Sequence, residues 1–176
     1  MDATRQDDRA LVARANAGEA AAFTALYRAH GDWAYAVAQR LVGDRDDARD
    51  VVQEAFDALF GKFPGFVLAS SIRAYLYPVL RHCAISALRR KRRIVPLDPE
   101  AAAARAPQPG WERGSPSDFD RMIAALPAEQ RAVVRLRFGL DFRLEEIADA
   151  LGVPLGTVKS RLHHALAALR KKDDPR

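Results

Sequence analysis

Apolar residues recur three and four positions apart along two stretches of the chain, residues 7–93 and 119–172, and runs of β-branched residues are few. This period is typical of helices that bury one face. Glycines and the segment GKFPGF at 61–66 separate the periodic blocks, as breaks between helices do. In the first stretch we expect helices at residues 7–16, 19–41, 44–60 and 71–92.

Residues 94–118, between the two periodic stretches, have a different composition. Five prolines occur in this short segment, and its apolar periodicity is weak. Proline-rich segments of this kind act as extended spacers without a core of their own. We therefore predict an all-α fold of two small helical domains, residues 1–93 and 119–176, joined by a linker at 94–118.

The segment RLEEIADALGVPLGTVKSRLHHALAALRKK, residues 143–172, has the layout of a helix-turn-helix. Gly152 allows the backbone to reverse after a first helix, and the small Ala148 allows a second helix to cross closely. An apolar stripe is expected on the inner side of each helix. It consists of Leu144, Ile147, Ala148 and Leu151 in the first helix, and of Val158, Leu162, Leu166 and Leu169 in the second.

The outward face of the second helix is polar and basic near its N-terminal half, the part of such a motif that enters the major groove of DNA. Basic, hydroxyl and imidazole groups can bind phosphates and base edges, and the helix N-terminus offers N–H groups to a phosphate. The alternative is a solvated face on a surface helix. The residues concerned are Thr157, Lys159, Ser160, Arg161, His163 and His164.

The stretch from ALPAEQRAVVRLRF to the end of this motif resembles region 4 of a sigma factor of the extracytoplasmic-function type, within the sigma-70 family. The resemblance implies that the second helix reads the minus-35 promoter element. The C-terminal half of LuxR-type regulators is similar, so a free-standing LuxR-like helix-turn-helix regulator is the alternative function. The C-terminal segment alone does not separate the two families.

The segment GDRDDARDVVQEAFDALF, residues 43–60, favours the sigma factor because it resembles sigma region 2.2. Its apolar residues are expected in the core, at Val51, Val52, Ala55, Phe56 and Leu59. The resemblance implies that its polar surface docks on the clamp helices of the RNA polymerase β′ subunit. For the chain as a whole, the expected contacts on RNA polymerase core are the β′ clamp helices and the β flap. An acidic solvated helix is the alternative. The polar surface consists of Asp46, Asp47, Asp50, Gln53 and Glu54.

Residues 70–93 resemble sigma regions 2.3 and 2.4, an aromatic segment followed by a basic end. Rings offer stacking planes to unpaired bases and cations hold phosphates, so this helix suits single-stranded DNA. The loop at 62–70 stands where the family has a loop that receives a base flipped from the minus-10 element. The expected minus-10 residues are Phe63, Phe66, Tyr75, His82, Arg89, Arg90, Lys91, Arg92 and Arg93, with Tyr77 as a further ring.

Three departures from the family pattern bear on this interpretation. Tyr75 stands at the place of a family tryptophan, and packing of Tyr75 in the core is the alternative to base stacking. His82 stands at the place of a common asparagine, so the family's base preference does not transfer. Pro78 removes one backbone hydrogen bond inside the helix, and we expect a bend between residues 74 and 78.

The formal net charge of +5 is distributed unevenly along the chain. Residues 61–93 carry eight basic residues and no acidic ones, whereas residues 1–60 carry seven basic and eleven acidic residues. Such segregation indicates one surface for a protein partner and another for a polyanion. Both promoter DNA and RNA polymerase core fit this division, and an anti-sigma factor as a further partner stays open.

Other chemistry has little support in the sequence. Cys83 is the single cysteine, which excludes an internal disulfide and favours the cytoplasm. No segment has the length of a membrane span or the layout of a signal peptide. The neighbouring pairs 82–83 and 163–164 lack the ligand spacing of a zinc site, and no phosphate loop or Ser-His-Asp pattern is found. We expect no metal, no cofactor and no enzymatic activity.

Overall fold

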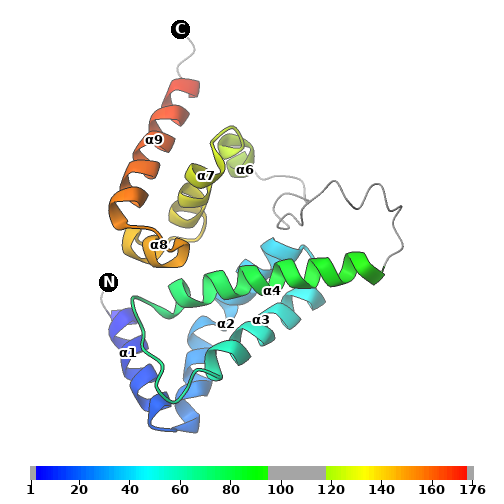
Figure 1. The fold of residues 1–176 in the computed structure, drawn as a ribbon, viewed down its shortest axis with the longest axis vertical. Helices are drawn as coiled ribbons and strands as arrows, with labels where there is room; N and C mark the ends of the chain where they lie inside the picture. The colour runs from blue at the N-terminus through cyan, green and yellow to red at the C-terminus, as the bar shows by residue number, and fades with distance from the viewer. Residues whose placement is uncertain (1–2, 95–117, 174–176) are drawn as a thin grey trace. The chain divides into compact units, whose positions relative to one another are not determined.

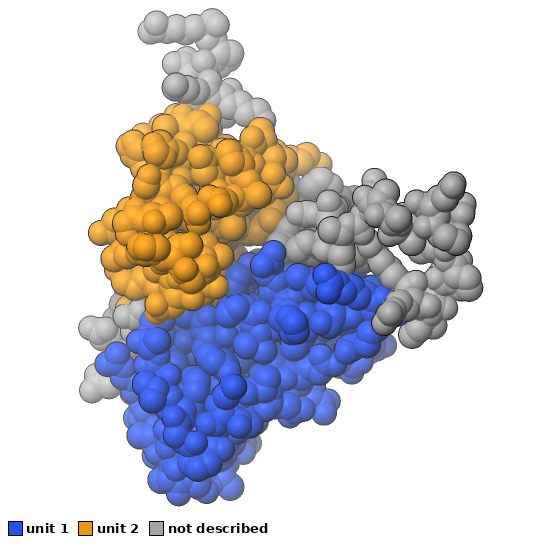
Figure 2. All heavy atoms as spheres, viewed as in Figure 1, with its two compact units in different colours: residues 1–114 blue, residues 115–176 orange. Residues whose placement is uncertain are grey.

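The computed structural model describes residues 3–94 and 118–173. These residues fall into two compact units, which belong to residues 1–114 and 115–176 (Figure 2). All regular elements in the described ranges are helices, which confirms the all-α fold expected from the apolar period. Most of the expected linker, residues 95–117, lies outside the described part of the chain.

The described part of the first unit consists of α1 (Ala3–Asn16), α2 (Ala20–Val42), α3 (Arg45–Phe60) and α4 (Ile72–Ile94). Local signals set the boundary between α2 and α3. Gly43 adopts the left-handed conformation with φ 79° and its N–H bonds to the carbonyl of Gln39. Asp44 then begins α3, because its carboxylate accepts hydrogen bonds from the amides of Asp46 and Asp47 at 3.0 Å.

The core of the first unit lies where α2, α3 and α4 pack against one another, and α1 packs against α2 (Figure 1). The apolar residues of α3 point into this core as expected, since Val51, Val52, Ala55, Phe56 and Leu59 are all buried. Each large apolar side chain that is fully buried contributes about 1.5–3 kcal/mol. The other helices contribute Leu26, Leu41, Ile72, Leu76 and Leu80 to the same core.

A buried polar pair links α1 to the rest of the first unit. Oδ1 of Asp8 on α1 lies 2.7 Å from Nε2 of His30 on α2, and both side chains are almost fully buried. Oδ2 of Asp8 accepts a hydrogen bond from the amide of Ile72 at 3.3 Å, where α4 begins. One carboxylate therefore holds three helices together.

Pro78 lies inside α4, and the helix continues through it to Ile94. The proline has no N–H, so the carbonyl of Ala74 lacks the hydrogen bond that residue 78 otherwise donates in a helix. Pro78 is exposed, which leaves the packed face of α4 intact. The bend expected between residues 74 and 78 stays a prediction.

The described part of the second unit consists of α6 (Asp118–Ile123), α7 (Ala128–Val134), the π-helical turn η2 (Arg135–Gly139), α8 (Leu144–Leu151) and α9 (Leu155–Asp173). The turn η2 continues α7, and the amide of Phe142 bonds back to the carbonyl of Leu136 at 3.0 Å. One buried cluster of this unit joins α9 to α6 and α7. It consists of Ile123, Leu126, Val134 and Ala165, with Phe119, Leu162 and Leu169 packed against them.

Helices α8 and α9 form the expected helix-turn-helix. Gly152 ends α8 in the left-handed conformation with φ 64°, the backbone reversal predicted at this residue. Of the apolar stripe expected on α9, Val158 is fully buried, whereas Leu162, Leu166 and Leu169 are half-buried. Ala165, which the expected stripe omitted, is fully buried in their midst.

Candidate nucleic-acid interface

The polar face expected on the second helix of the helix-turn-helix lies on α9. Lys159, Ser160, His163 and His164 are exposed there, and the two imidazole rings lie 5.8 Å apart. Thr157 and Arg161 are half-buried. The structure thus brings all six residues onto one helix, and it leaves four of them open to a ligand.

Arg161 forms an ion pair with a carboxylate of another helix in the second unit. Its Nη2 lies 2.6 Å from Oε2 of Glu129, near the start of α7. The side chain of Arg161 is 23% exposed and that of Glu129 is 71% exposed. A phosphate that binds Arg161 therefore competes with a carboxylate already in place.

The polar residues expected on α3 share one surface, with Asp46, Asp50 and Gln53 exposed and Asp47 and Glu54 half-buried. Asp46 pairs with Arg49 on the same helix at 3.1 Å. Exposed pairs of this kind contribute little stability. Asp50 and Gln53 are therefore well placed to meet a partner from outside.

Two ion pairs join this acidic surface to the basic end of α4. Asp47 lies 2.8 Å from Nζ of Lys91, and Glu54 lies 2.8 Å from Nη2 of Arg90. The hydrogen bond that Lys91 donates to Asp47 raises the pKa of Lys91, which keeps the ammonium charged. The acidic surface of α3, expected to bind a protein, therefore lies directly beside the basic end of α4, expected to bind DNA.

The basic end of α4 also includes Arg89, which is exposed. Arg92 and Arg93 belong to α4, but their side chains lie outside the described part of the structure. A cationic helix end of this kind can follow a phosphate backbone.

The aromatic residues expected at the loop between α3 and α4 form a continuous cluster. The ring of Phe63 lies 5.3 Å from that of Phe66, and Phe66 meets Tyr75 edge-on at 4.9 Å. The ring of Phe23 on α2 also packs against Phe63, with the two ring centres 5.3 Å apart. The three residues of the expected site, Phe63, Phe66 and Tyr75, are half-buried, so each ring keeps some surface for a base.

Tyr77 was expected to offer a further stacking ring, and this expectation is wrong. Tyr77 is only 7% exposed, because it belongs to the face of α4 that packs into the core. Tyr75 is half-buried instead, and burial raises the pKa of its hydroxyl. His82 is exposed and follows Tyr75 by seven residues, two helical turns, so the two residues lie on the same side of α4.

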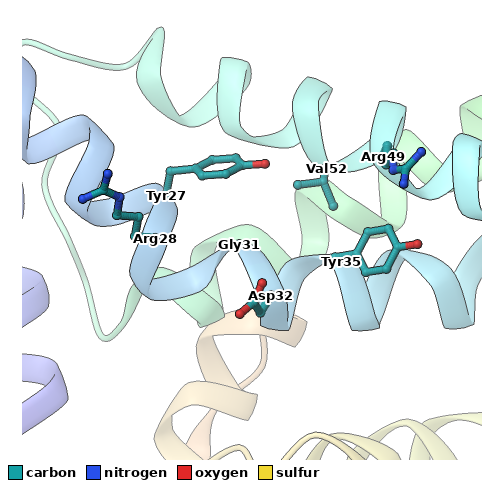
Figure 3. Close-up of a pocket in the computed structure, with 7 residues that line it drawn as sticks. All are labelled: Tyr27, Arg28, Gly31, Asp32, Tyr35, Arg49 and Val52. Carbon is teal, nitrogen blue, oxygen red and sulfur yellow. The ribbon is translucent and has the colours of Figure 1, made fainter.

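A pocket of about 520 Å³ opens on the first unit between α2 and α3 (Figure 3). Arg49 lines it and also pairs with Asp46, so the pocket borders the acidic surface of α3. The ring of Tyr27 lies along α2 against Gly31, 3.4 Å from where a side-chain carbon at residue 31 would stand. The lining residues are Tyr27, Arg28, Gly31, Asp32, Tyr35, Arg49 and Val52.

The pocket was not expected from the sequence, although a signal for it exists. Tyr27, Gly31 and Tyr35 follow one another at intervals of four, which places two rings and a gap on one side of a helix.

Two further features concern other chemistry. Within residues 3–94 and 118–173, no three histidine, cysteine or acidic side chains are grouped to hold a metal ion. None of the helices described is both long and apolar enough to cross a membrane.

Both units match known sequence families. Residues 26–94 match the family described as Sigma-70 region 2. Residues 117–169 match the family described as Sigma-70, region 4. The two matches stand in one chain, in the order that the sequence resemblance implied.

Two solved structures have a similar fold. CnrH, solved in complex with the cytosolic domain of CnrY, aligns with a TM-score of 0.60 at 24% identity, covering 94% of this chain and 96% of CnrH. The sigma factor RpoE from Bartonella quintana, solved with the anti-sigma factor NepR, aligns with a TM-score of 0.56 at 25% identity, covering 85% of this chain and 94% of RpoE.

Relatives of similar length extend over both units. The ECF RNA polymerase sigma factor SigL of Mycobacterium tuberculosis is 35% identical over 170 residues, which cover 92% of this chain and 94% of SigL. The RNA polymerase sigma-E factor of Streptomyces avermitilis is 35% identical over 162 residues, which cover 90% of this chain and 89% of that factor. The chain therefore belongs to the extracytoplasmic-function (ECF) sigma factors of the sigma-70 family.

Proposed function

We propose that this chain binds RNA polymerase core in the cytoplasm, brings it to specific promoters and helps to open the DNA there. The observation that carries this proposal is the presence of a region 2 unit and a region 4 unit in one chain. A sigma factor needs both, because one unit holds the polymerase and the melted strand while the other reads duplex DNA. The chain itself performs no bond chemistry in this function.

The exposed face of α9 reads the minus-35 element as duplex. Lys159 supplies an exposed cation for a phosphate, and Ser160, His163 and His164 supply groups that can bond to base edges in the major groove. Thr157 stands in the first turn, close to the helix N-terminus that attracts phosphate. Arg161 reaches DNA only when it leaves or shares Glu129.

The aromatic cluster and the basic end of α4 receive the minus-10 strand after the bases have separated. Stacking of a base on an aromatic ring contributes about 1–3 kcal/mol, and phosphates bind to exposed cations such as Arg89. Because this energy is gained only with unpaired bases, binding shifts the promoter toward the open state. Phe66, Tyr75 and His82 are the side chains that we assign to this strand.

The acidic surface of α3 docks on the polymerase core. Asp50 and Gln53 make the first contacts because both are exposed, and the pocket beside them offers the half-exposed ring of Tyr27 as an apolar anchor. Interfaces combine such aromatic anchors with a polar rim. The same surface suits an anti-sigma factor, the kind of partner seen with RpoE of Bartonella quintana.

The alternative function, a free-standing LuxR-like regulator, is not favoured. It explains the helix-turn-helix but gives no role to the first unit, which matches Sigma-70 region 2. Such a regulator binds its duplex site tightly without polymerase. A sigma factor of this kind needs polymerase to hold its two DNA-binding units at a fixed span.

Reconstituted transcription tests the proposal. The full chain is added to purified core polymerase, transcripts are mapped on genomic DNA, and association is measured by fluorescence anisotropy. We expect promoter-specific transcripts in the presence of the chain only. A core enzyme that neither binds the chain nor starts transcription with it would contradict the function.

Asp50→Arg tests the docking surface. We expect association with core polymerase to weaken by at least about tenfold, because the substitution replaces an exposed anion by a cation at the centre of the surface. Asp50 is preferable to Glu54, since Glu54 also holds Arg90 within the chain. Asp7→Arg is the matched control, because Asp7 is exposed on α1. Equal association of Asp50→Arg and wild type would remove α3 from the interface.

A further inference from the structure

The side chain of Asn16, the last residue of α1, binds the backbone of the loop between α3 and α4. Its Oδ1 accepts hydrogen bonds from the amides of Gly65 at 2.7 Å and Phe66 at 3.0 Å. Its Nδ2 donates a hydrogen bond to the carbonyl of Phe66 at 2.9 Å. One side chain therefore meets three backbone groups of the loop, although it lies 49 and 50 residues away in the sequence.

Helix α1 also holds the far end of this loop. The loop spans residues 61–71, and Asp8 on α1 binds the amide of Ile72, the first residue of α4. Asp8 is buried and fixed in turn by His30. Asn16 and Asp8 lie about two turns apart on α1, so one short helix contacts the middle and the end of the loop.

These contacts decide where the aromatic rings of the loop lie. Gly65 has φ 98°, a left-handed conformation that other residues adopt with strain. Asn16 binds the amides of Gly65 and Phe66 and the carbonyl of Phe66, so it holds the backbone at this point. The ring of Phe66, whose backbone is held at both its N–H and its carbonyl, reaches Tyr75 and Phe63. An ordered loop has already lost the conformational entropy that a ligand otherwise has to remove.

We propose that Asn16 is a positioning residue for minus-10 recognition, which holds the loop 61–71 in the conformation that receives the unpaired strand without contacting DNA itself. This inference rests on the function proposed above. The residues that match Sigma-70 region 2 begin at 26, so α1 lies before the matched part. The role that we propose for Asn16 therefore rests on its hydrogen bonds and not on the family match.

Three variants distinguish the effect of the hydrogen bonds between Asn16 and the loop from a change in the stability of α1. Asn16→Ala removes all three hydrogen bonds to the loop. Asn16→Asp keeps an oxygen for the amides of Gly65 and Phe66 but loses the donor to the carbonyl. Arg14→Ala is the matched control, because Arg14 stands on the same last turn of α1 and its Nε pairs with the exposed Glu19 at 2.7 Å.

Binding of the minus-10 strand is the first readout. The full chain is combined with core polymerase, and a fluorescent single-stranded oligonucleotide of the minus-10 sequence, taken from a promoter mapped as above, is titrated in. We expect Asn16→Ala to weaken this binding about tenfold, which corresponds to a loop that is competent about one tenth of the time. Asn16→Asp should lie between Asn16→Ala and wild type, and Arg14→Ala should match wild type.

Two measurements distinguish positioning from a general loss of structure. Binding of duplex minus-35 DNA and association with core polymerase should stay at the wild-type level in all three variants. Asn16 is also the only asparagine in the chain, so labelling with ¹⁵N-asparagine gives a single side-chain NH₂ group to follow. We expect the hydrogen of this group that is bound to Phe66 to exchange slowly with solvent.

The outcomes decide between the two proposals. If the wild-type chain starts no transcription with core polymerase, the proposed function is overturned, and the role of Asn16 with it. If wild type opens promoters and Asn16→Ala binds the minus-10 strand equally well, only the role of Asn16 is overturned. The same holds if Arg14→Ala loses as much binding, or if the side-chain amide of Asn16 exchanges as fast as in an unfolded chain.

Discussion

Glu129→Gln should strengthen the binding of duplex minus-35 DNA, although Glu129 lies on α7 and outside the helix that reads the duplex. The carboxylate of Glu129 holds Arg161 at 2.6 Å, so Arg161 leaves or shares this partner before it binds a phosphate. Glutamine has nearly the same shape but carries no charge. The substitution therefore frees Arg161 without opening a cavity.

The magnitude follows from the exposure of the pair. The carboxylate is 71% exposed and the guanidinium is 23% exposed, so the pair contributes about 0.2–1 kcal/mol, the range of solvated ion pairs. Removing this competition raises the duplex affinity by about 1.4- to 5-fold. A freed Arg161 that gains a full phosphate contact also steepens the dependence of log affinity on log salt by about 0.9.

Lys159 provides the reference for this measurement. Lys159 is exposed, so Lys159→Ala should flatten the salt dependence by about 0.9, which is a factor of about 3.5 in affinity between 50 and 200 mM salt. Arg161→Ala should flatten it by less, because Glu129 already offsets part of the charge of Arg161. The two substitutions are thus expected to differ, although both remove one positive charge.

Fluorescence anisotropy with a labelled minus-35 duplex at four salt concentrations measures these effects. Asp118→Asn is the matched control, since it removes a carboxylate of α6 that pairs with Arg121 and not with α9. If Glu129→Gln leaves both affinity and salt dependence unchanged while Lys159→Ala changes them, Arg161 does not bind phosphate. The role of Arg161 is then to fasten α9 to α7.

Three further predictions concern the first unit. Asp8→Ala leaves two buried groups without their partner, so the free energy of unfolding should fall by about 3–5 kcal/mol in urea denaturation followed by circular dichroism. The hydrogen bond from the amide of Asp47 lowers the pKa of Asp44. The stability contributed by Asp44 is therefore present above about pH 4 and is lost as the pH falls through the lowered pKa. Asp44→Asn keeps an acceptor that does not titrate, so it should remove this loss from a plot of unfolding free energy against pH. Burial raises the pKa of the Cys83 thiol, so Ellman's reagent should react slowly at pH 7 until the chain unfolds, and a fast reaction in native buffer would contradict its buried position.

Helices and their ends could be predicted from the sequence because their causes are local. The apolar period indicated α2 and α3 to within a residue or two, and the reversal at Gly152 was predicted from the freedom of glycine to adopt positive φ. The inward face of α3 was predicted except for Ala48, which is also fully buried. The polar face of α9 could be predicted for the same reason, since residues three and four apart share one side of a helix.

The contacts between distant segments were decided by the tertiary structure alone. Tyr75 and Tyr77 have similar neighbours in the sequence, and only the packing of α4 on α2 and α3 buries the second ring and leaves the first half-exposed. The pairing of Lys91 with Asp47 joins residues 44 positions apart, across two helices. Periodicity shows which side of a helix is buried, but it does not show which helix lies opposite.

Asn16 is the plainest case of this division between sequence and tertiary structure. In the sequence it is a polar residue at the end of a helix, where asparagine is common, and nothing nearby indicates a further role. Its three hydrogen bonds exist because folding brings the end of α1 beside a loop some fifty residues later. Local patterns fix which elements form and which residues share a face, since these depend on neighbouring residues; the partners of each face depend on how the helices pack, which is a property of the whole unit.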